Sequence, residues 1–283
     1  MLKKLKKLCR EPRLWVAVAA SVAAIVLFVL IVISIKNSGH QDLFTPDPYT
    51  PPTDGPTGPT LEANPFSPED FVYEGDYLTC LSTPAVLGID VSEWQGNIDW
   101  AKVKDAGIRY AMIRLGYRGS TNGLMNEDEK LRQNYEGAKE NGISVGFYFF
   151  SQAISVEEAV EEAEFVLERI KDWQVRMPIV YDWEYISQTA RTANMDARTL
   201  TECTKAFCKT IEDAGYEAMV YFNESQSMKQ MYLTELMDYR FWLAQYSHTM
   251  SYPYRVDMWQ YTCEGSVPGI TGNVDINLFF EYS

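Results

Sequence analysis

The stretch MPIVYDWE, residues 177–184, joins a short apolar run to two acids spaced two residues apart. Side chains in a β-strand alternate between its two faces, so Asp182 and Glu184 project from the same face with Cα atoms roughly 7 Å apart. Burying one carboxylate is costly, and burying two side by side requires that one of them keeps a proton. An apolar strand with this ending is typical of acid–base chemistry at its carboxyl end. The competing interpretation is a strand that runs out into a solvated loop with two hydrated acids.

Short apolar runs alternate with amphipathic segments on both sides of this stretch. Eight runs have the character of strands, at residues 86–91, 109–115, 143–150, 178–184, 217–222, 240–246, 256–261 and 273–279. Helical spacing occupies residues 97–106, 126–141, 156–173 and 196–214. Strand–helix alternation indicates a parallel sheet, and the helices thin out towards the end of the chain. We therefore predict an α/β fold, an irregular β/α barrel of about eight strands with helices mainly in the first five units.

Catalytic groups of such barrels lie at the carboxyl ends of the strands. Applied to the predicted strands, this rule selects Asp90 after the first, Asp182 and Glu184 after the fourth, and Asp275 near the last. The first and last strands of a closed barrel are neighbours, so Asp90 and Asp275 are expected to flank the same opening. Four acids that converge on one opening are difficult to explain by folding alone.

Several segments, in this order, closely resemble glycoside hydrolase family 25, the lysozymes that cleave peptidoglycan as N-acetylmuramidases. The resemblance runs from about Gly88 to Phe280 and is specific as a set. The matching segments are GIDVS (88–92), WQG (94–96), GFYFFS (146–151), PIVYDWE (178–184), WLAQY (242–246), MWQY (258–261), VPGI (267–270) and NVDIN (273–277).

The resemblance implies a glycosidase that cuts the β-1,4 bond between N-acetylmuramic acid and N-acetylglucosamine. Glu184 would be the general acid, and its pKa must be raised for it to hold a proton near neutral pH. Asp182 would stay ionised and orient the 2-acetamido group of the sugar, whereas Asp90 and Asp275 would maintain the electrostatics of the site. A second route, in which a carboxylate activates water, needs acids ~6.5–9.5 Å apart. Asp182 and Glu184 are too close together for a water between them, which favours the route through the 2-acetamido group.

Aromatic side chains at a barrel mouth suit stacking on sugar faces, and Tyr148, Trp242 and Trp259 are the candidates; ordinary core packing is the alternative for each. Two other functions are considered. One is a tethered barrel that binds peptidoglycan without cutting it, against which the intact acids weigh. The other is a chitinase-like hydrolase, which needs further acids where this chain has Pro178 and Val180.

The first 84 residues differ from the rest. Residues 1–13 are basic. Residues 14–35 contain no charge, and the length of this run exceeds the ~20 residues that a membrane-spanning helix needs. A cleaved signal peptide has a shorter apolar region and a small-residue cleavage site, so a retained anchor is favoured. The prediction is a cytoplasmic segment (1–13), a transmembrane helix (14–35), a Pro/Thr-rich extracellular tether (36–84) and an extracellular hydrolase barrel (85–283) on a single-pass cell-membrane protein.

Composition limits the partners. The net charge is −14, although the first 36 residues carry seven Lys or Arg and a single acid. So acidic an outer part argues against nucleic acid or an anionic membrane as a partner. It gives no electrostatic help in binding a polyanionic wall either, so affinity for the peptidoglycan glycan strands that the resemblance implies must come from a specific groove. Neither a metal nor a cofactor is expected, because the chain has two histidines and no CxxC motif. Cys80 and Cys263 could pair if the two ends of the domain meet.

Overall fold

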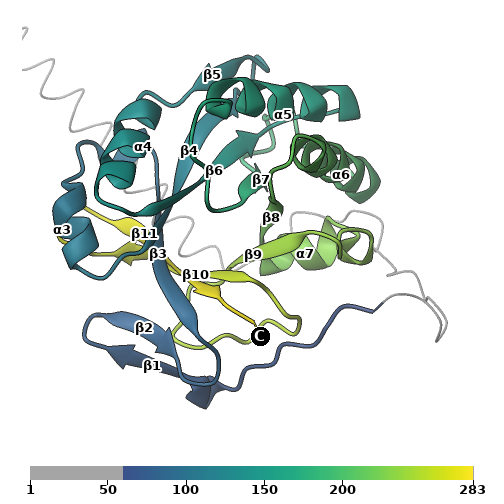
Figure 1. Ribbon diagram of the computed structural model, residues 1–283. Helices are drawn as coiled ribbons and strands as arrows, with labels where there is room; N and C mark the ends of the chain where they lie inside the picture. Colours follow the sequence, from purple (N-terminus) through teal and green to yellow (C-terminus); the bar gives the residue numbers. More distant parts are fainter. Residues whose placement is uncertain (1–59, 283) are drawn as a thin grey trace, which may run out of the picture. The chain divides into compact units, whose positions relative to one another are not determined.

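A closed barrel of eight strands forms the centre of the computed structural model, which describes residues 60–282 (Figure 1). β3 closes the ring by pairing with β4 on one side and β11 on the other. In order around the barrel, the strands are β3 (Ala85–Val91), β4 (Tyr110–Arg118), β6 (Ser144–Ser151), β7 (Ile179–Trp183), β8 (Ala218–Asn223), β9 (Arg240–Ala244), β10 (Met258–Gly265) and β11 (Val274–Phe280). The eight-stranded barrel predicted from the sequence is confirmed.

The last strand reverses the direction of the sheet. β3 to β10 are parallel to their neighbours around the ring, whereas β11 is antiparallel to both β10 and β3. A parallel return needs a crossover of a dozen or more residues, and only residues 266–273 separate β10 from β11. The parallel sheet predicted from the strand–helix alternation is found for β3 to β10, whereas β11 lies in the last part of the barrel, which was predicted to be irregular. Because of the reversal, the start of β11 lies at the barrel mouth, and Asp275 is paired in register with Asp90.

Helices follow the first five barrel strands, as predicted. They are α3 (Trp100–Asp105), α4 (Leu131–Glu140), α5 (Val156–Ile170), α6 (Ala197–Asp213) and α7 (Glu224–Lys229). The side chains of Asp99, Ser155 and Asp196 cap α3, α5 and α6 by accepting a hydrogen bond from a backbone N–H of the first turn. The short strand β5 (Met125–Glu127) and α7 were not predicted, because both are too short to show a period in the sequence.

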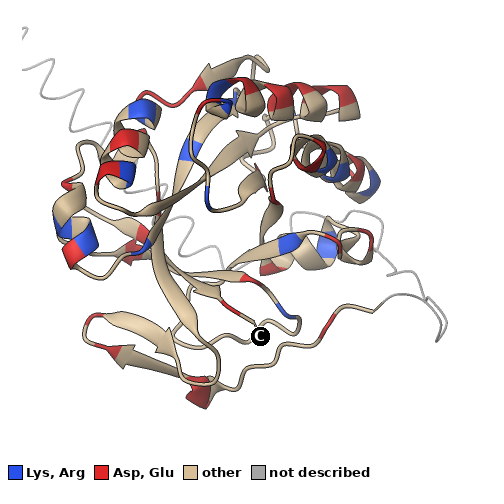
Figure 2. Cartoon of the chain, in the orientation of Figure 1, with Lys and Arg blue, Asp and Glu red and all other residues tan. Residues whose placement is uncertain are grey.

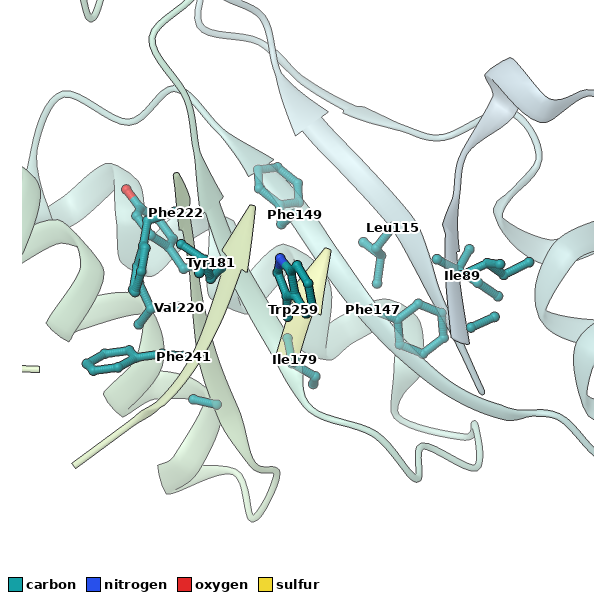
Figure 3. Packing of buried hydrophobic residues seen from close by; sticks show 14 of the residues in the cluster. Ile89, Leu115, Phe147, Phe149, Ile179, Tyr181, Val220, Phe222, Phe241 and Trp259 are labelled. Atoms are coloured by element: carbon teal, nitrogen blue, oxygen red, sulfur yellow. The ribbon is translucent and has the colours of Figure 1, made fainter. Parts of the chain in front are cut away.

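Apolar side chains pack in two layers, one inside the barrel and one between the strands and the helices. The inner layer includes Met112, Val180 and Met258. The outer layer is larger, and Figure 3 shows part of it, with Tyr181 and Trp259 among its aromatic members. Strand alternation sorts neighbouring residues between the two layers, which leaves the inward side chains at the strand ends to form the site.

The predicted tether is partly a folded element. Residues 71–80 form a hairpin of β1 (Phe71–Glu74) and β2 (Tyr77–Cys80), and Phe71 and Leu78 are buried. The Phe71 ring lies 4.8 Å, centroid to centroid, from that of Trp259. The boundary at residue 84 was therefore wrong. Proline content marked the segment as a linker, whereas the alternating apolar residues of FVYEGDYLTC indicated strands.

The predicted cytoplasmic segment, the transmembrane helix at residues 14–35 and the first part of the tether lie outside the described residues. Within residues 60–282, none of the helices has the length and apolar character needed to cross a membrane.

Candidate active site

Four carboxyl groups from three strands line a single pocket of about 250 Å³ at the mouth of the barrel. We call it the acid pocket. Its lining comprises Asp90, Ser92, Trp94, Gln95, Arg114, Tyr148, Phe150, Asp182, Glu184, Tyr221, Trp242, Tyr246, Gln260 and Asp275. The structure thus brings together all four acids selected from the sequence.

β7 supplies two of the acids through simple alternation. Val180 and Asp182 face the barrel interior, whereas Tyr181 and Trp183 belong to the outer apolar layer. Glu184 follows directly after the last strand residue and returns to the inward side. Gln152 fixes the chain at this point, because its side-chain amide donates to the Glu184 backbone carbonyl at 3.0 Å.

Asp90 is held by two amides. The side-chain amides of Gln260 and Asn277 each donate to Oδ2 of Asp90 at 2.8 Å. The indole N–H of Trp242 donates to Oδ1 of Asn277 at 2.9 Å, which orients that amide with its nitrogen towards Asp90. The Tyr221 hydroxyl does the same for Gln260 by donating to its Oε1 at 3.2 Å. Each oriented amide fixes the Asp90 carboxyl in one position.

Asp182 has a different environment. Its side chain is buried, and Oδ1 has no hydrogen-bond partner among residues 60–282. A buried carboxylate oxygen in this state is costly unless a ligand satisfies it. The cation that lines the same pocket is Arg114, which forms ion pairs with Glu93 at 2.6 Å and with Asp128 at 2.7 Å.

Burial raises the pKa of all four acids. The charge of Asp275 raises the pKa of Asp90 and of Glu184 further, and burial raises that of Asp275 to about 6. For Asp182, burial and the charge of Glu184 raise the pKa, whereas Arg114 lowers it. Four adjacent carboxyls cannot all ionise, so the cluster retains a proton near neutral pH. Arg114 opposes the rise in the pKa of Asp182, but burial and the charges of Glu184 and Asp90 outweigh it.

The three aromatic candidates divide into two groups. Tyr148 and Trp242 line the acid pocket, with ring centroids 6.2 Å apart. Trp259 does not line it. Its ring is fully buried in the outer layer, and its indole N–H donates to the Gln245 carbonyl at 2.8 Å. The prediction for Trp259 was wrong because Met258 and Gln260 take the inward positions of β10, so the residue between them points outward.

Sequence reasoning missed several residues in or beside the acid pocket. Arg114 lies in the inward phase of an apolar strand, two residues after Met112. Gln260 and Asn277 are amides inside strands, where a polar side chain needs a partner. Trp94, which the sequence left open between sugar stacking and core packing, is 79% exposed at the pocket wall, so core packing does not account for it.

Cys80 and Cys263 do not form a disulfide, since both are free thiols in the structure. Nor does any group of three or more His, Cys, Asp or Glu side chains in the described part of the chain have an arrangement that could hold a metal ion.

Comparison with known proteins gives the chain a family. The sequence model of glycosyl hydrolases family 25 matches residues 89–270, which is most of the barrel. The chain belongs to this family. The resemblance seen in the sequence is thereby confirmed, and family 25 membership makes the chain a glycoside hydrolase.

Two curated relatives and one solved structure illustrate the match. The "Uncharacterized protein YegX" of Escherichia coli K12 is 31% identical over 210 residues, covering 69% of both chains. The "Autolytic lysozyme" of Clostridium acetobutylicum is 27% identical over 198 residues, covering 69% of this chain and 56% of the relative. The modular autolysin LytC of Streptococcus pneumoniae superposes with a TM-score of 0.60 at 30% identity, over 69% of this chain and 46% of LytC.

The family 25 acid pocket should cost stability above neutral pH. The pKa of Asp275 is about 6 in the folded chain against 3.8 ordinarily, so its protonated form is favoured by folding. The stabilisation of the folded state by protonated Asp275 is fully present below pH 3.8 and is lost as the pH rises through 6. We expect Asp275→Asn to stabilise the chain near pH 8 by about 1–2 kcal/mol and to have no effect near pH 4. Thermal unfolding at both pH values measures this, with Asp172→Asn as the exposed control. Equal destabilisation at both would contradict it.

Proposed function

We propose that the chain is a peptidoglycan hydrolase that cleaves the β-1,4 bond between N-acetylmuramic acid and N-acetylglucosamine. The observation that carries the proposal is the meeting of Asp182 and Glu184 with Asp90 and Asp275 in one pocket. Two of the relatives support the substrate. The Clostridium acetobutylicum protein is named a lysozyme, and LytC was also solved with a synthetic peptidoglycan ligand.

In this mechanism Glu184 is the general acid that protonates the glycosidic oxygen as the bond breaks. Burial and the charge of Asp275 raise its pKa, so it holds the proton to a higher pH than an ordinary glutamate does. Asp182 orients the 2-acetamido group of the sugar, whose carbonyl oxygen attacks the anomeric carbon. The amide N–H of that group is a suitable donor for the unpartnered Oδ1 of Asp182. The acetamido oxygen of the substrate thus forms the new bond, and Glu184 protonates the oxygen that leaves.

Asp90 and Asp275 act on the charge of the pocket. Asp90 is fixed by two amides, whose hydrogen bonds favour its ionised form against the effect of burial, and that form contributes negative charge near the cationic transition state of glycoside hydrolysis. The partly exposed ring of Tyr148 presents aromatic surface to the sugar rings, whereas Trp242 lines the pocket with a side chain that is only 2% exposed. The alternative route, with water activated by a carboxylate, gives the inverted anomer and is distinguished by product stereochemistry.

Digestion of a purified wall of defined composition tests the proposed bond. Mass spectrometry of the products, after reduction of their new ends, should find reduced muramic acid and no reduced glucosamine. A glucosamine end would assign the cut to the other β-1,4 bond of the strand. Absence of any new reducing end from folded protein would leave the chain as a binding barrel.

We further propose that residues 14–35 anchor the chain in the cell membrane, with residues 1–13 in the cytoplasm and the barrel outside. The support is the uncharged run of residues 14–35 and its basic flank. The full chain should stay with the membrane fraction after an alkaline wash, and a chain lacking residues 1–35 should be released. Release of the full chain by the wash would refute the anchor.

A further inference from the structure

The backbone at Glu184 lies just beyond the end of its strand. β7 ends at Trp183, whose register partner is Ser151 of β6, and the pairing with β8 ends one residue earlier. Past the last pairing, the buried carbonyl groups of the chain must find donors other than the sheet. Rotation of the backbone at this point would carry the Glu184 carboxyl out of the acid pocket.

Two side-chain amides supply the donors. The amide of Gln226, in α7, donates to the Trp183 carbonyl at 2.6 Å. The amide of Gln152, directly after β6, donates to the Glu184 carbonyl at 3.0 Å. Gln226 is 3% exposed and Gln152 is fully buried, and neither is among the residues that line the acid pocket. The peptide groups on both sides of the Glu184 α-carbon are therefore held by residues that do not face the substrate.

Gln152 also holds the far end of the loop that Glu184 begins. The Thr192 hydroxyl donates to Oε1 of Gln152 at 2.6 Å, and Nη1 of Arg191 donates to the Gln152 backbone carbonyl at 3.1 Å. Thr192 is 1% exposed. With Oε1 engaged by Thr192, the amide nitrogen of Gln152 faces the carbonyls of Glu184 and of Ser151, the latter at 2.8 Å. One amide thus ties together both ends of the loop.

An ion pair fixes Arg191 in turn. α5 carries a run of acids, which appear as red bands in Figure 2. One of them, Glu158, accepts two hydrogen bonds from the Arg191 guanidinium at 2.7 and 2.8 Å, and both side chains are less than a quarter exposed. A bidentate pair of this kind fixes orientation as well as distance. The loop of residues 184–192 is therefore attached to α5 as well as to Gln152.

We infer that Gln152, oriented by Thr192, is a positioning residue for Glu184 and determines where the acid's carboxyl stands in the pocket. The contacts that hold Asp90 are made to its carboxyl, whereas those of Gln152 and Gln226 are made to the backbone around Glu184. The inference rests on the proposed function, in which Glu184 donates the proton. A misplacement of about 1 Å in a reacting group can lower a rate on the order of 10²-fold.

Substitutions at Thr192 test the inference with little change of shape. Valine is isosteric with threonine but cannot donate, so Thr192→Val releases Oε1 of Gln152. We expect it to lower kcat on soluble wall glycan about three- to tenfold, with KM nearly unchanged. Thr192→Ser keeps the hydroxyl and should restore kcat. Gln152→Met keeps the length of the side chain but removes both of its donors, and it should lower kcat about 10- to 100-fold.

The pH profile separates positioning from a loss of folded protein. Burial and the charge of Asp275 raise the pKa of Glu184. An acid displaced from the pocket loses both effects, so the alkaline limb of kcat should lie at lower pH in Gln152→Met than in the wild type. A chain that is only destabilised would give fewer active molecules, with the limb where it was.

Thr204→Val is the matched control. Thr204 is fully buried in α6, and its hydroxyl donates to the Leu200 carbonyl of the same helix at 2.8 Å. The substitution removes a buried hydroxyl, as Thr192→Val does, but leaves Gln152 untouched. It should keep the kcat, KM and alkaline limb of the wild type. Thermal midpoints of all variants show whether each chain is folded.

Hydrogen exchange gives a readout that does not depend on activity. The backbone amides of residues 185–192 should exchange faster in Thr192→Val and in Gln152→Met than in the wild type, and at the wild-type rate in Thr192→Ser and Thr204→Val. Should Gln152→Met fail to fold, the two Thr192 variants decide the question alone.

Two results would overturn the inference. The first is a folded Thr192→Val with the kcat and the loop exchange of the wild type. The second is an equal loss of kcat in Thr192→Val and Thr204→Val with unmoved alkaline limbs, which would give both hydroxyls a role in stability only. Failure of the proposed function is distinguishable from either, because the unmutated chain would then release no reducing ends, while the exchange of residues 185–192 would still report on Gln152.

Discussion

Glu184→Gln should abolish almost all release of reducing ends from purified peptidoglycan while leaving binding of the glycan intact. Glutamine keeps the size and the hydrogen-bonding capacity of the side chain but cannot donate a proton to a leaving oxygen. General acid catalysis contributes about 10²–10⁴-fold to a rate, and we expect a loss in that range. Initial rates of reducing-end release and the affinity for wall glycan, both measured on the full chain, give the two readouts.

The pH profile adds a second criterion. Burial and the charge of Asp275 raise the pKa of Glu184, so the protonated acid persists above the usual range and is lost as the pH rises through that pKa. Wild-type activity should therefore fall on the alkaline side, and the residual activity of Glu184→Gln should lack this fall. Glu140→Gln, at an exposed position at the end of α4, is the matched control and should behave as wild type. A Gln variant with an unchanged rate would reassign the acid.

Much of the fold could be predicted because each barrel strand corresponds to a separate apolar run in the sequence, with turn residues between the runs. The direction of β11 could not, because strand direction depends on the length of a connection and not on the period of its residues. Residues 68–80 were misjudged for a related reason. The prolines that precede them, together with Pro68 and Gly75, indicate a linker, and Phe71 finds its aromatic partners Phe66, Trp259 and Phe280 only in the folded chain.

Within the site, the acids were predictable and their supports were not. A carboxylate at the end of an apolar strand is costly to bury, so Asp90 and Asp182 stand out in the sequence. Gln260 and Asn277 are uncharged, and their role appears only when β10 and β11 bring them beside Asp90. Trp259 shows the opposite error, because aromatic character suggested a sugar platform while its phase on β10 pointed it outward.

Asp182→Asn should lower the rate by about 10²–10³-fold and should do so without loss of glycan affinity. Oδ1 of Asp182 is buried without a partner among the described residues, and the charge of Arg114 opposes the rise in its pKa that burial, Glu184 and Asp90 cause. An ionised Asp182 both accepts the N–H of the 2-acetamido group and stabilises the positive charge that this group gains on attack. Asparagine has the shape but not the charge. Asp172→Asn, on the exposed loop after α5, is the matched control.

The stereochemistry of the product decides which role Asp182 plays. Attack by the acetamido oxygen followed by water gives two inversions, so proton NMR of early products should show the β-anomer of the new muramic acid end. Wall glycan that has lost its N-acetyl groups should then be cut as slowly by wild type as N-acetylated wall is by Asp182→Asn, since each lacks one half of the same interaction. An α-anomer at early times, with undiminished cutting of the N-deacetylated wall, would contradict this role and assign water as the attacking group.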